Sequence, residues 1–483
     1  MRQSPPFVRS RMKVALSLAM LLAGVVLASL SAAAETPSPQ RPLALCPENS
    51  HYLLFRGKPT VLITSGEHYG AVLNLDFDYL PYLDEMQACG MNLTRTFSGV
   101  YCEDRHSFNI KGNPLAPAEG RLICPWARSD TAGYAGGGNK FDLNRWDAAY
   151  FARLKDFVGQ AARRGIVVEL VLFCPFYEDA MWNLSPMKAE NNVNGVGKAV
   201  RTEVYTLEHA DLLAAHEAVA RKIVAELNDF DNVYYEICNE PYFGGVTIAW
   251  QNRIAAAIVD AEAKLPNKHL IAQNIANGST KIDHPNPQVS IFNFHYCRPP
   301  DAVEMNSALG RVIADDETGF KGSDDVTYRT EGWDFILAGG GIYDNLDYSF
   351  TPDHESGTAR PDAPGGGGRA LRKQLAILKD FLHGFDFVGM KPDNSVVQGG
   401  LPPKTTARAL VEKGKQYAVY INGPGVSKLD VELPAGRYRV EWVNTLSGAV
   451  DKAETIRHDA GRRSLVAPDY SADVALSIRR LGE

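Results

Sequence analysis

The sequence predicts an α/β fold, a (β/α)8 TIM barrel followed by a small antiparallel β-sandwich. Eight short apolar runs alternate with helical segments between about residues 50 and 386, the fifth connection being the weakest, as in parallel sheets that close into barrels. The run 166–173 is apolar almost throughout, which is typical of a strand buried on both faces. From about residue 391 no helical period appears, and short runs between Gly, Pro and Asn turns indicate antiparallel strands.

The expected barrel strands are, in order, 58–65, 91–97, 166–173, 233–238, 269–275, 288–296, 311–317 and 341–347. The expected helices are 77–88, 143–164, 207–227, 247–264, 302–309, 325–338 and 369–382. The expected C-terminal strands are 416–421, 428–433, 438–443 and 474–478. Two long irregular stretches, 99–140 and 175–201, interrupt the alternation, and loops of such length are usually functional.

The N-terminus has the pattern of a signal peptide. Four basic residues precede the apolar run 14–30, and Ser31-Ala-Ala-Ala34 offers a small-residue cleavage site. An apolar run of this length is marginal for a membrane anchor. We therefore expect a signal peptide over 1–34, the barrel over 35–390 and the β-sandwich over 391–483. The protein is expected to be exported, either periplasmic or secreted, with no membrane attachment in its mature form.

The net charge limits the expected binding partners, and the cysteine content limits the expected disulfide bonds and metal sites. The net charge is −7 and the mature region has no basic cluster, which argues against nucleic acid or an anionic membrane as a partner. The seven cysteines are an odd number, so at least one is unpaired within the chain. Cys102 and Cys124 share a long loop and are the expected disulfide, since export permits one. The sequence has neither a C-x-x-C motif nor a closely spaced set of Cys and His residues, so a structural zinc site is not expected. No cofactor is expected either.

Two carboxyls are expected to meet at the mouth of the barrel. Glu240 ends the fourth strand within Asn239-Glu240-Pro241, and Glu317 ends the seventh; every barrel strand brings its C-terminal end to the same face. Glycoside hydrolysis requires such a pair, one carboxyl to donate a proton and one to attack or to activate water. An Asn-Glu-Pro also suits an ordinary turn. Asp315 and Asp316 compete with Glu317, and strand alternation places Asp315 and Glu317 on the same side.

These motifs resemble the clan A glycoside hydrolases, retaining (β/α)8 enzymes that include the family 5 cellulases and mannanases. The resemblance covers roughly residues 50–386 and rests on Asn239-Glu240-Pro241, Glu317, Arg95 near the end of strand two, and His295-Tyr296 at strand six. It implies that Glu240 is the acid/base and Glu317 the nucleophile. It also implies that Asn239 binds the sugar 2-OH and that Arg95 steadies the nucleophile.

Two features depart from the family 5 pattern. His295 and Tyr296 are adjacent, whereas the family commonly has one residue between them; adjacent strand residues face opposite ways. We therefore expect one in the site, preferably His295, and the other packed. Strand eight lacks the common Trp platform, and Trp333 falls in the preceding helix, where core packing is expected. Residues 328–333 and 385–392 also resemble bacterial apiosidase-related proteins that carry a C-terminal β-domain.

Further candidates for sugar binding follow the strands. Glu67 and His68 end strand one, where they line the mouth or pair with neighbouring loops. Trp126, Tyr177 and Trp182 lie on the long loops, where aromatic faces stack on sugar rings or pack within the loops.

The sequence thus predicts an exported retaining glycoside hydrolase that acts on an oligo- or polysaccharide without a metal. One alternative is a non-catalytic carbohydrate-binding barrel, against which the presence of both carboxyls counts. Another is a metal-dependent hydrolase using Asp315, Asp316, Glu317, His295 and His68, but these residues lack the H-x-H and H-E-x-x-H spacings.

Overall fold

The computed structural model describes residues 41–482. The expected signal peptide over 1–34 lies outside the described residues. Among the described helices, none has the length and apolar character needed to cross a membrane.

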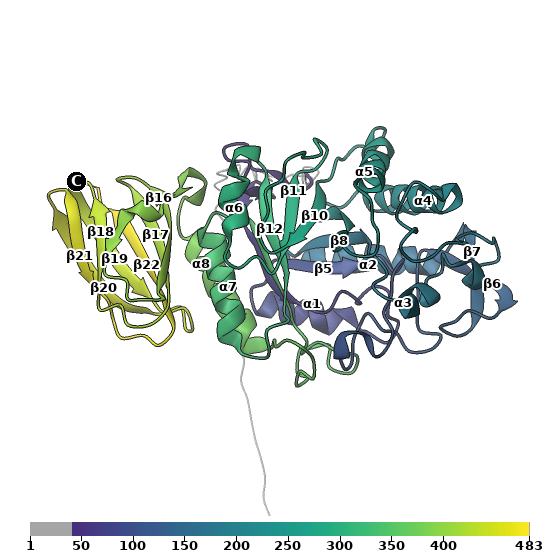
Figure 1. The fold of residues 1–483 in the computed structure, drawn as a ribbon. Coiled ribbons are helices and arrows are strands. Elements are labelled where there is room, and N and C mark those ends of the chain that lie inside the picture. Colours follow the sequence, from purple (N-terminus) through teal and green to yellow (C-terminus); the bar gives the residue numbers. More distant parts are fainter. Residues whose placement is uncertain (1–40, 483) are drawn as a thin grey trace, which may run out of the picture. The chain divides into compact units, whose positions relative to one another are not determined.

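Eight parallel strands form a barrel-like sheet (Figure 1). They are β4 (Leu62–Gly66), β5 (Leu93–Phe97), β8 (Val167–Phe173), β9 (Val233–Cys238), β10 (Ile271–Asn277), β11 (Ile291–His295), β12 (Val312–Thr318) and β13 (Ile342–Leu346). Seven successive pairings run from β4 through β13 back down to β5. Between β4 and β5, the side chain of Asn92 accepts from the Ile63 amide and donates to the Val61 carbonyl, both at 2.8 Å. An expected strand matches each of the eight.

Helices follow most of these strands. They are α1 (Tyr79–Ala88), α2 (Ala148–Arg163), α3 (Asp179–Leu184), α4 (Ala210–Leu227), α5 (Ile248–Glu262), α6 (Asp301–Met305), α7 (Asp325–Leu337) and α8 (Arg369–His383). Asp78 begins α1 by accepting from the Leu80 amide at 2.9 Å, which satisfies an amide that the helix cannot pair. The segment 278–290 between β10 and β11 contains no helix.

A β-hairpin stands where the sequence suggested an irregular loop and an early helix start. Its strands are β6 (Trp126–Ala132) and β7 (Asn139–Trp146). Gly137 and Gly138 form its turn with φ of 89° and 83°, a backbone that favours glycine. Helix α2 consequently begins only at Ala148, after the capping Asp147. The expectation failed because the outer strand residues are polar and resemble loop sequence.

A small three-stranded sheet precedes the barrel, with strands β1 (Ala44–Leu45), β2 (Leu53–Phe55) and β3 (Lys58–Thr60). The expected first strand, 58–65, is therefore divided between β3 and β4.

The C-terminal region is an antiparallel β-structure of two sheets around its own apolar core. Its strands are β14 (Lys391–Pro392), β15 (Val397–Gly399), β16 (Thr406–Glu412), β17 (Gln416–Asn422), β18 (Lys428–Leu433), β19 (Gly436–Val443), β20 (Val450–His458), β21 (Gly461–Val466) and β22 (Asp473–Arg480). The four expected strands correspond to β17, β18, β19 and β22. Strands such as β20 escaped the sequence analysis because most of their residues are polar and at least partly exposed.

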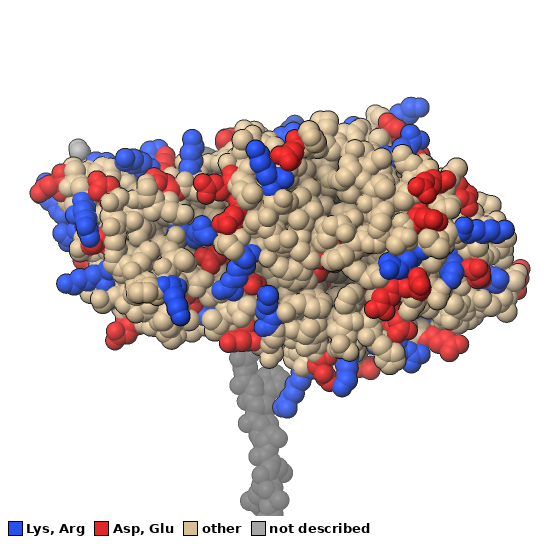
Figure 2. All heavy atoms as spheres, in the orientation of Figure 1, with Lys and Arg blue, Asp and Glu red and all other residues tan. Residues whose placement is uncertain are grey.

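Helix α7 packs against the C-terminal sheet. Arg329 forms a buried ion pair with Asp473 at 2.5 Å, and Trp333 stacks on Tyr420 with ring centroids 5.2 Å apart. Trp333 is therefore core, as expected. On the face shown in Figure 2, acidic and basic side chains are interspersed.

The expected disulfide between Cys102 and Cys124 is absent, because all seven cysteines are buried free thiols. Burial raises the pKa of both thiols to about 12, so both stay protonated and unreactive near neutral pH.

Candidate active site

A cavity of about 640 Å³ opens at the C-terminal ends of the barrel strands. Its lining includes six of the residues expected in the site, namely His68, Tyr177, Asn239, Glu240, Tyr296 and Glu317. The cavity therefore lies where a barrel places its chemistry.

Glu317 accepts hydrogen bonds on both oxygens. Tyr69 and Arg95 donate to Oε2 at 3.1 and 3.2 Å, and the Tyr296 hydroxyl donates to Oε1 at 2.7 Å. Burial alone would raise the pKa of Glu317, but the positive charges of His295 and Arg95 outweigh burial and hold the pKa below its usual range. Glu317 is thus held as an ionised carboxylate.

Glu240 lies opposite in a different setting. The Tyr177 hydroxyl donates to Oε2 at 2.6 Å, and the Tyr242 hydroxyl to Oε1 at 3.1 Å. The backbone of Glu240 has φ of 35°, an unusual value for a residue with a side chain. Such strain is often stored at functional sites, and here it lies just beyond the end of β9.

The two carboxyls lie close together. A carboxylate oxygen of Glu240, a carboxylate oxygen of Glu317 and a ring nitrogen of His295 all lie within 4.8 Å of one another. A separation of this order suits a reaction in which one carboxyl attacks a carbon while the other serves the leaving oxygen.

Arg95 connects the two sides of the site. Its Nη2 donates to Oδ1 of Asn239 at 2.8 Å, in addition to the Nη1 contact with Glu317. Asn239 in turn donates to the Tyr177 hydroxyl at 2.9 Å, which reaches Glu240. One buried guanidinium thus orients groups that contact both carboxyls.

Both His295 and Tyr296 reach the carboxyls, so the expectation that one of them is packed away is wrong. Nδ1 of His295 lies 3.1 Å from Oε1 of Glu240 and 3.5 Å from Oε1 of Glu317. Tyr296 stands just beyond β11 with φ of 52°. This left-handed backbone turns the side chain back toward the mouth, which strand alternation did not anticipate.

The expected pairing of Asp315 with Glu317 on one side of the strand is also wrong. The register of β12 against β11 skips one residue, since Phe294 pairs with Asp315 and His295 pairs with Glu317. Asp316 is the extra residue, and its carboxylate lies 3.3 Å from Nε of Arg95. Asp315 instead accepts from the Cys297 amide at 3.2 Å. A bulge in β12 therefore sends both Asp316 and Glu317 inward.

Three of the further sugar-binding candidates lie outside the cavity lining, as do Arg95 and His295, which act on the carboxyls from behind it. Glu67 is fully buried, and its two oxygens accept from the amides of Gly70 and Ala71. Trp126 is buried in β6, and the buried Trp182 donates through Nε1 to the carbonyl of Ala199 at 3.0 Å. Glu67 therefore pairs with a neighbouring loop, and the two tryptophans pack within the fold, which were the alternatives to sugar binding for these residues.

His68 does line the cavity, paired with a residue that the sequence analysis missed. Its Nε2 lies 3.3 Å from Oε2 of Glu103, while its Nδ1 is buried without a partner. Tyr69 and Tyr242 were missed as well. Their position next to His68 and Pro241, at strand ends, was the available signal.

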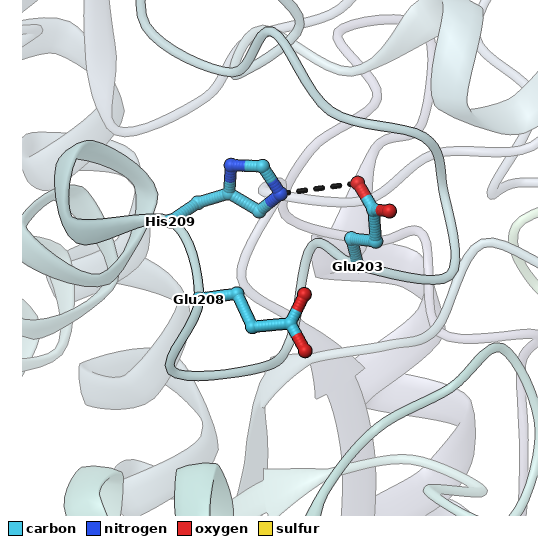
Figure 3. Close-up of side chains that lie close together, drawn as sticks. All are labelled: Glu203, Glu208 and His209. Atoms are coloured by element: carbon cyan, nitrogen blue, oxygen red, sulfur yellow. Dashed lines mark hydrogen bonds and ion pairs between the residues drawn. The ribbon is translucent and has the colours of Figure 1, made fainter.

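Among the described residues, three clusters have side chains of the kinds that bind metals, and the first is Glu240, His295 and Glu317 in the site itself. Glu169, Glu236 and Asp316 lie together inside the barrel, where the guanidinium of Arg95 already supplies positive charge. A third set, Glu203, Glu208 and His209, lies on the loop before α4 (Figure 3). There His209 pairs with Glu203 at 3.1 Å, and nothing further indicates a ligand.

Comparison with known proteins agrees with this geometry. Residues 121–332 match the family model described as cellulase, glycosyl hydrolase family 5. No curated protein matches the chain. The further resemblance to apiosidase-related proteins stays a prediction.

Solved structures share the fold over nearly the whole chain. A candidate glycoside hydrolase from Bacteroides vulgatus is 14% identical, with a TM-score of 0.66 over 92% of this chain and 83% of that one. A family 5 glycoside hydrolase from the same organism is 16% identical, with a TM-score of 0.62 over 91% and 92%. A third structure, described as a glycoside hydrolase, is 17% identical, with a TM-score of 0.63 over 91% and 97%. At these identities the likeness concerns the fold. The family match, over residues 121–332, indicates a glycoside hydrolase domain similar to family 5.

Proposed function

We propose that this protein hydrolyses O-glycosidic bonds of an oligo- or polysaccharide by double displacement, with net retention at the anomeric carbon. The observation that carries the proposal is the facing pair Glu240 and Glu317, with carboxylate oxygens within 4.8 Å. Retaining enzymes hold their carboxyls about 5–5.5 Å apart, and inverting enzymes leave a wider gap for water.

In the first step, Glu317 attacks the anomeric carbon while Glu240 gives its proton to the departing glycosidic oxygen. In the second step, Glu240 removes a proton from water, and that water releases the sugar from Glu317. The hydrogen bonds from Arg95, Tyr69 and Tyr296 keep Glu317 ionised and aimed. No step draws on a metal or cofactor.

The alternative function is carbohydrate binding without catalysis. The three donors on Glu317 favour catalysis, because they hold an ionised carboxylate in place opposite Glu240. Binding without turnover would be the outcome that favours the alternative.

The test is turnover of aryl glycosides and of plant and bacterial polysaccharides by the wild type and by Glu317→Ala and Glu240→Ala. Glu317→Ala should abolish turnover of every substrate that responds. In Glu240→Ala, kcat/KM should fall far less on a dinitrophenyl glycoside than on a polysaccharide, because kcat/KM reports the first step and that leaving group departs without a proton. Glu454→Ala, on β20 away from the cavity, is the matched control. Unchanged turnover in Glu317→Ala would refute the proposal.

We also propose that residues 1–34 direct export, that 35–390 form the catalytic domain and that 391–483 form a β-domain bracing it. The support is the basic, apolar and small-residue pattern of the N-terminus and the buried Arg329–Asp473 contact. N-terminal sequencing of protein from the periplasm or medium should begin at Glu35.

A further inference from the structure

The wall of the cavity closes on itself around the catalytic pair. On the side of Glu240, the ring of Phe108 lies 5.4 Å from that of Tyr177. Tyr177 lies 5.7 Å from Phe243, and Phe243 lies 5.0 Å from Tyr242. Aromatic rings at such centroid distances are in direct contact, so this arc has no gap.

The other arc completes the circuit. The Tyr242 hydroxyl donates to Asn277 at the end of β10, and β10 pairs directly with β11 up to His295. Tyr296, which follows, lies 6.1 Å from Phe320. Phe320 then returns to Phe108 at 6.2 Å. Side chains and paired backbone therefore enclose the mouth on every side.

Phe108 contacts both arcs and so connects them. It comes from the loop after β5 and spans between Tyr177, which follows β8, and Phe320, which follows β12. Phe108 and Asn109 both have left-handed backbones, with φ of 55° and 57°. Two such residues in succession are rare. The next two residues anchor the loop: Ile110 is buried, and the Lys111 amide donates to the Asp362 carbonyl at 3.1 Å.

Phe108, His68, Glu103 and Phe320 line one side of the cavity. The His68–Glu103 pair lies on this side, and the Tyr348 ring lies 5.8 Å from His68 and 6.3 Å from Phe320. The unpartnered Nδ1 of His68 offers a donor or acceptor to a sugar hydroxyl. This side of the cavity thus offers polar groups to a bound sugar, and the contacts of Phe108 with Tyr177 and Phe320 leave no gap between the loops that bound it.

We infer that this enzyme is exo-acting and removes the terminal sugar from the non-reducing end of a chain. The inference rests on the proposed function. The sugar that becomes attached to Glu317 occupies the side of Phe108, between Tyr69 and His68. The leaving portion departs through the open mouth on the side of Tyr242, whose hydroxyl contacts Glu240, the group proposed to protonate the leaving oxygen. An internal segment of a polysaccharide must extend out of the site at both ends. The contacts of Phe108 with Tyr177 and Phe320 block the path on one side.

The test uses an oligosaccharide of the responsive class labelled at its reducing end, together with the matching aryl monoglycoside. Wild type should shorten the labelled chain by one sugar at a time and release monosaccharide. Phe108→Ala removes the contacts with Tyr177 and Phe320 and opens this side of the site, so labelled fragments from internal cleavage should now appear. Its turnover of the aryl monoglycoside should fall by about tenfold or less, since an aromatic contact contributes about 0.5–1.5 kcal/mol. Leu80→Ala, an equally exposed residue of α1, should behave like the wild type.

Internal fragments among the first products of the wild type would overturn the inference while leaving glycoside hydrolysis intact. So would a Phe108→Ala variant that retains strictly stepwise shortening. Absence of turnover of both substrates by the wild type would instead refute the proposed function, and the inference with it.

Discussion

The hydroxyl of Tyr296 donates to Oε1 of Glu317 at 2.7 Å. The contact exists because the backbone of Tyr296 is left-handed and turns its ring toward the mouth. It is one of the interactions that lower the pKa of Glu317. Tyr296 therefore acts on both the position and the charge of the proposed nucleophile.

Replacing Tyr296 with Phe should remove this hydrogen bond and little else. A lost hydrogen bond to a charged group costs about 1.5–3 kcal/mol, so kcat should fall by about 10- to 100-fold. Because the pKa of Glu317 is then lowered less, Glu317 takes up its proton at a higher pH. The acid limb of the pH–rate profile should therefore move to higher pH.

The control for this change is Tyr205→Phe, since the buried hydroxyl of Tyr205 has no partner and lies outside the cavity lining. It should leave both kcat and the acid limb in place. An unmoved acid limb in Tyr296→Phe would contradict the proposed role.

Glu67 should make stability depend on pH. Burial raises its pKa from 4.5 to about 7, although the Gly70 and Ala71 amides favour the charged form. Between these values the folded state binds a proton that the unfolded state has lost. The free energy of unfolding contributed by Glu67 is thus complete below the unfolded pKa and is lost as pH rises toward 7.

Urea unfolding of wild type and Glu67→Gln across this pH range measures the effect. The variant should lose less stability with rising pH, by up to about 1.4 kcal/mol per pH unit. Glu119→Gln, an exposed residue, should match the wild type. Identical slopes in wild type and Glu67→Gln would contradict the account.

The Arg329–Asp473 pair should bind the barrel to the C-terminal sheet. Both side chains are 1% exposed, and breaking a buried pair leaves a charge without a partner, at a cost of about 3–5 kcal/mol. Arg329→Ala should lower the free energy of unfolding by that amount. Arg439→Ala breaks the exposed pair with Glu441 and should cost about 0–1 kcal/mol. Equal effects would show that the buried pair contributes little.

Much of this fold could be predicted because apolar runs determine where buried strands lie. The rule that barrel strands end at one face then placed Glu240, Glu317 and Arg95 together without any contact information. The family 5 match confirms the expected resemblance, even though His295 and Tyr296 are adjacent and strand eight has no tryptophan.

What the sequence did not predict depends on local backbone exceptions. The bulge at Asp316 and the left-handed Tyr296 each break strand alternation, and neither residue type signals such a backbone. Trp126 and Trp182 were expected on loops, but the hairpin and helix α3 bury them. Long-range packing of that kind is not contained in the local pattern.

The stereochemistry of the first-formed sugar tests the central claim most directly. Proton NMR of an aryl glycoside during its first minutes of hydrolysis distinguishes the two anomers before they interconvert. Double displacement through Glu317 predicts that the product first appears with the same anomeric configuration as the substrate. A first product of opposite configuration would contradict the account, because Glu317 would then activate water instead of attacking the sugar.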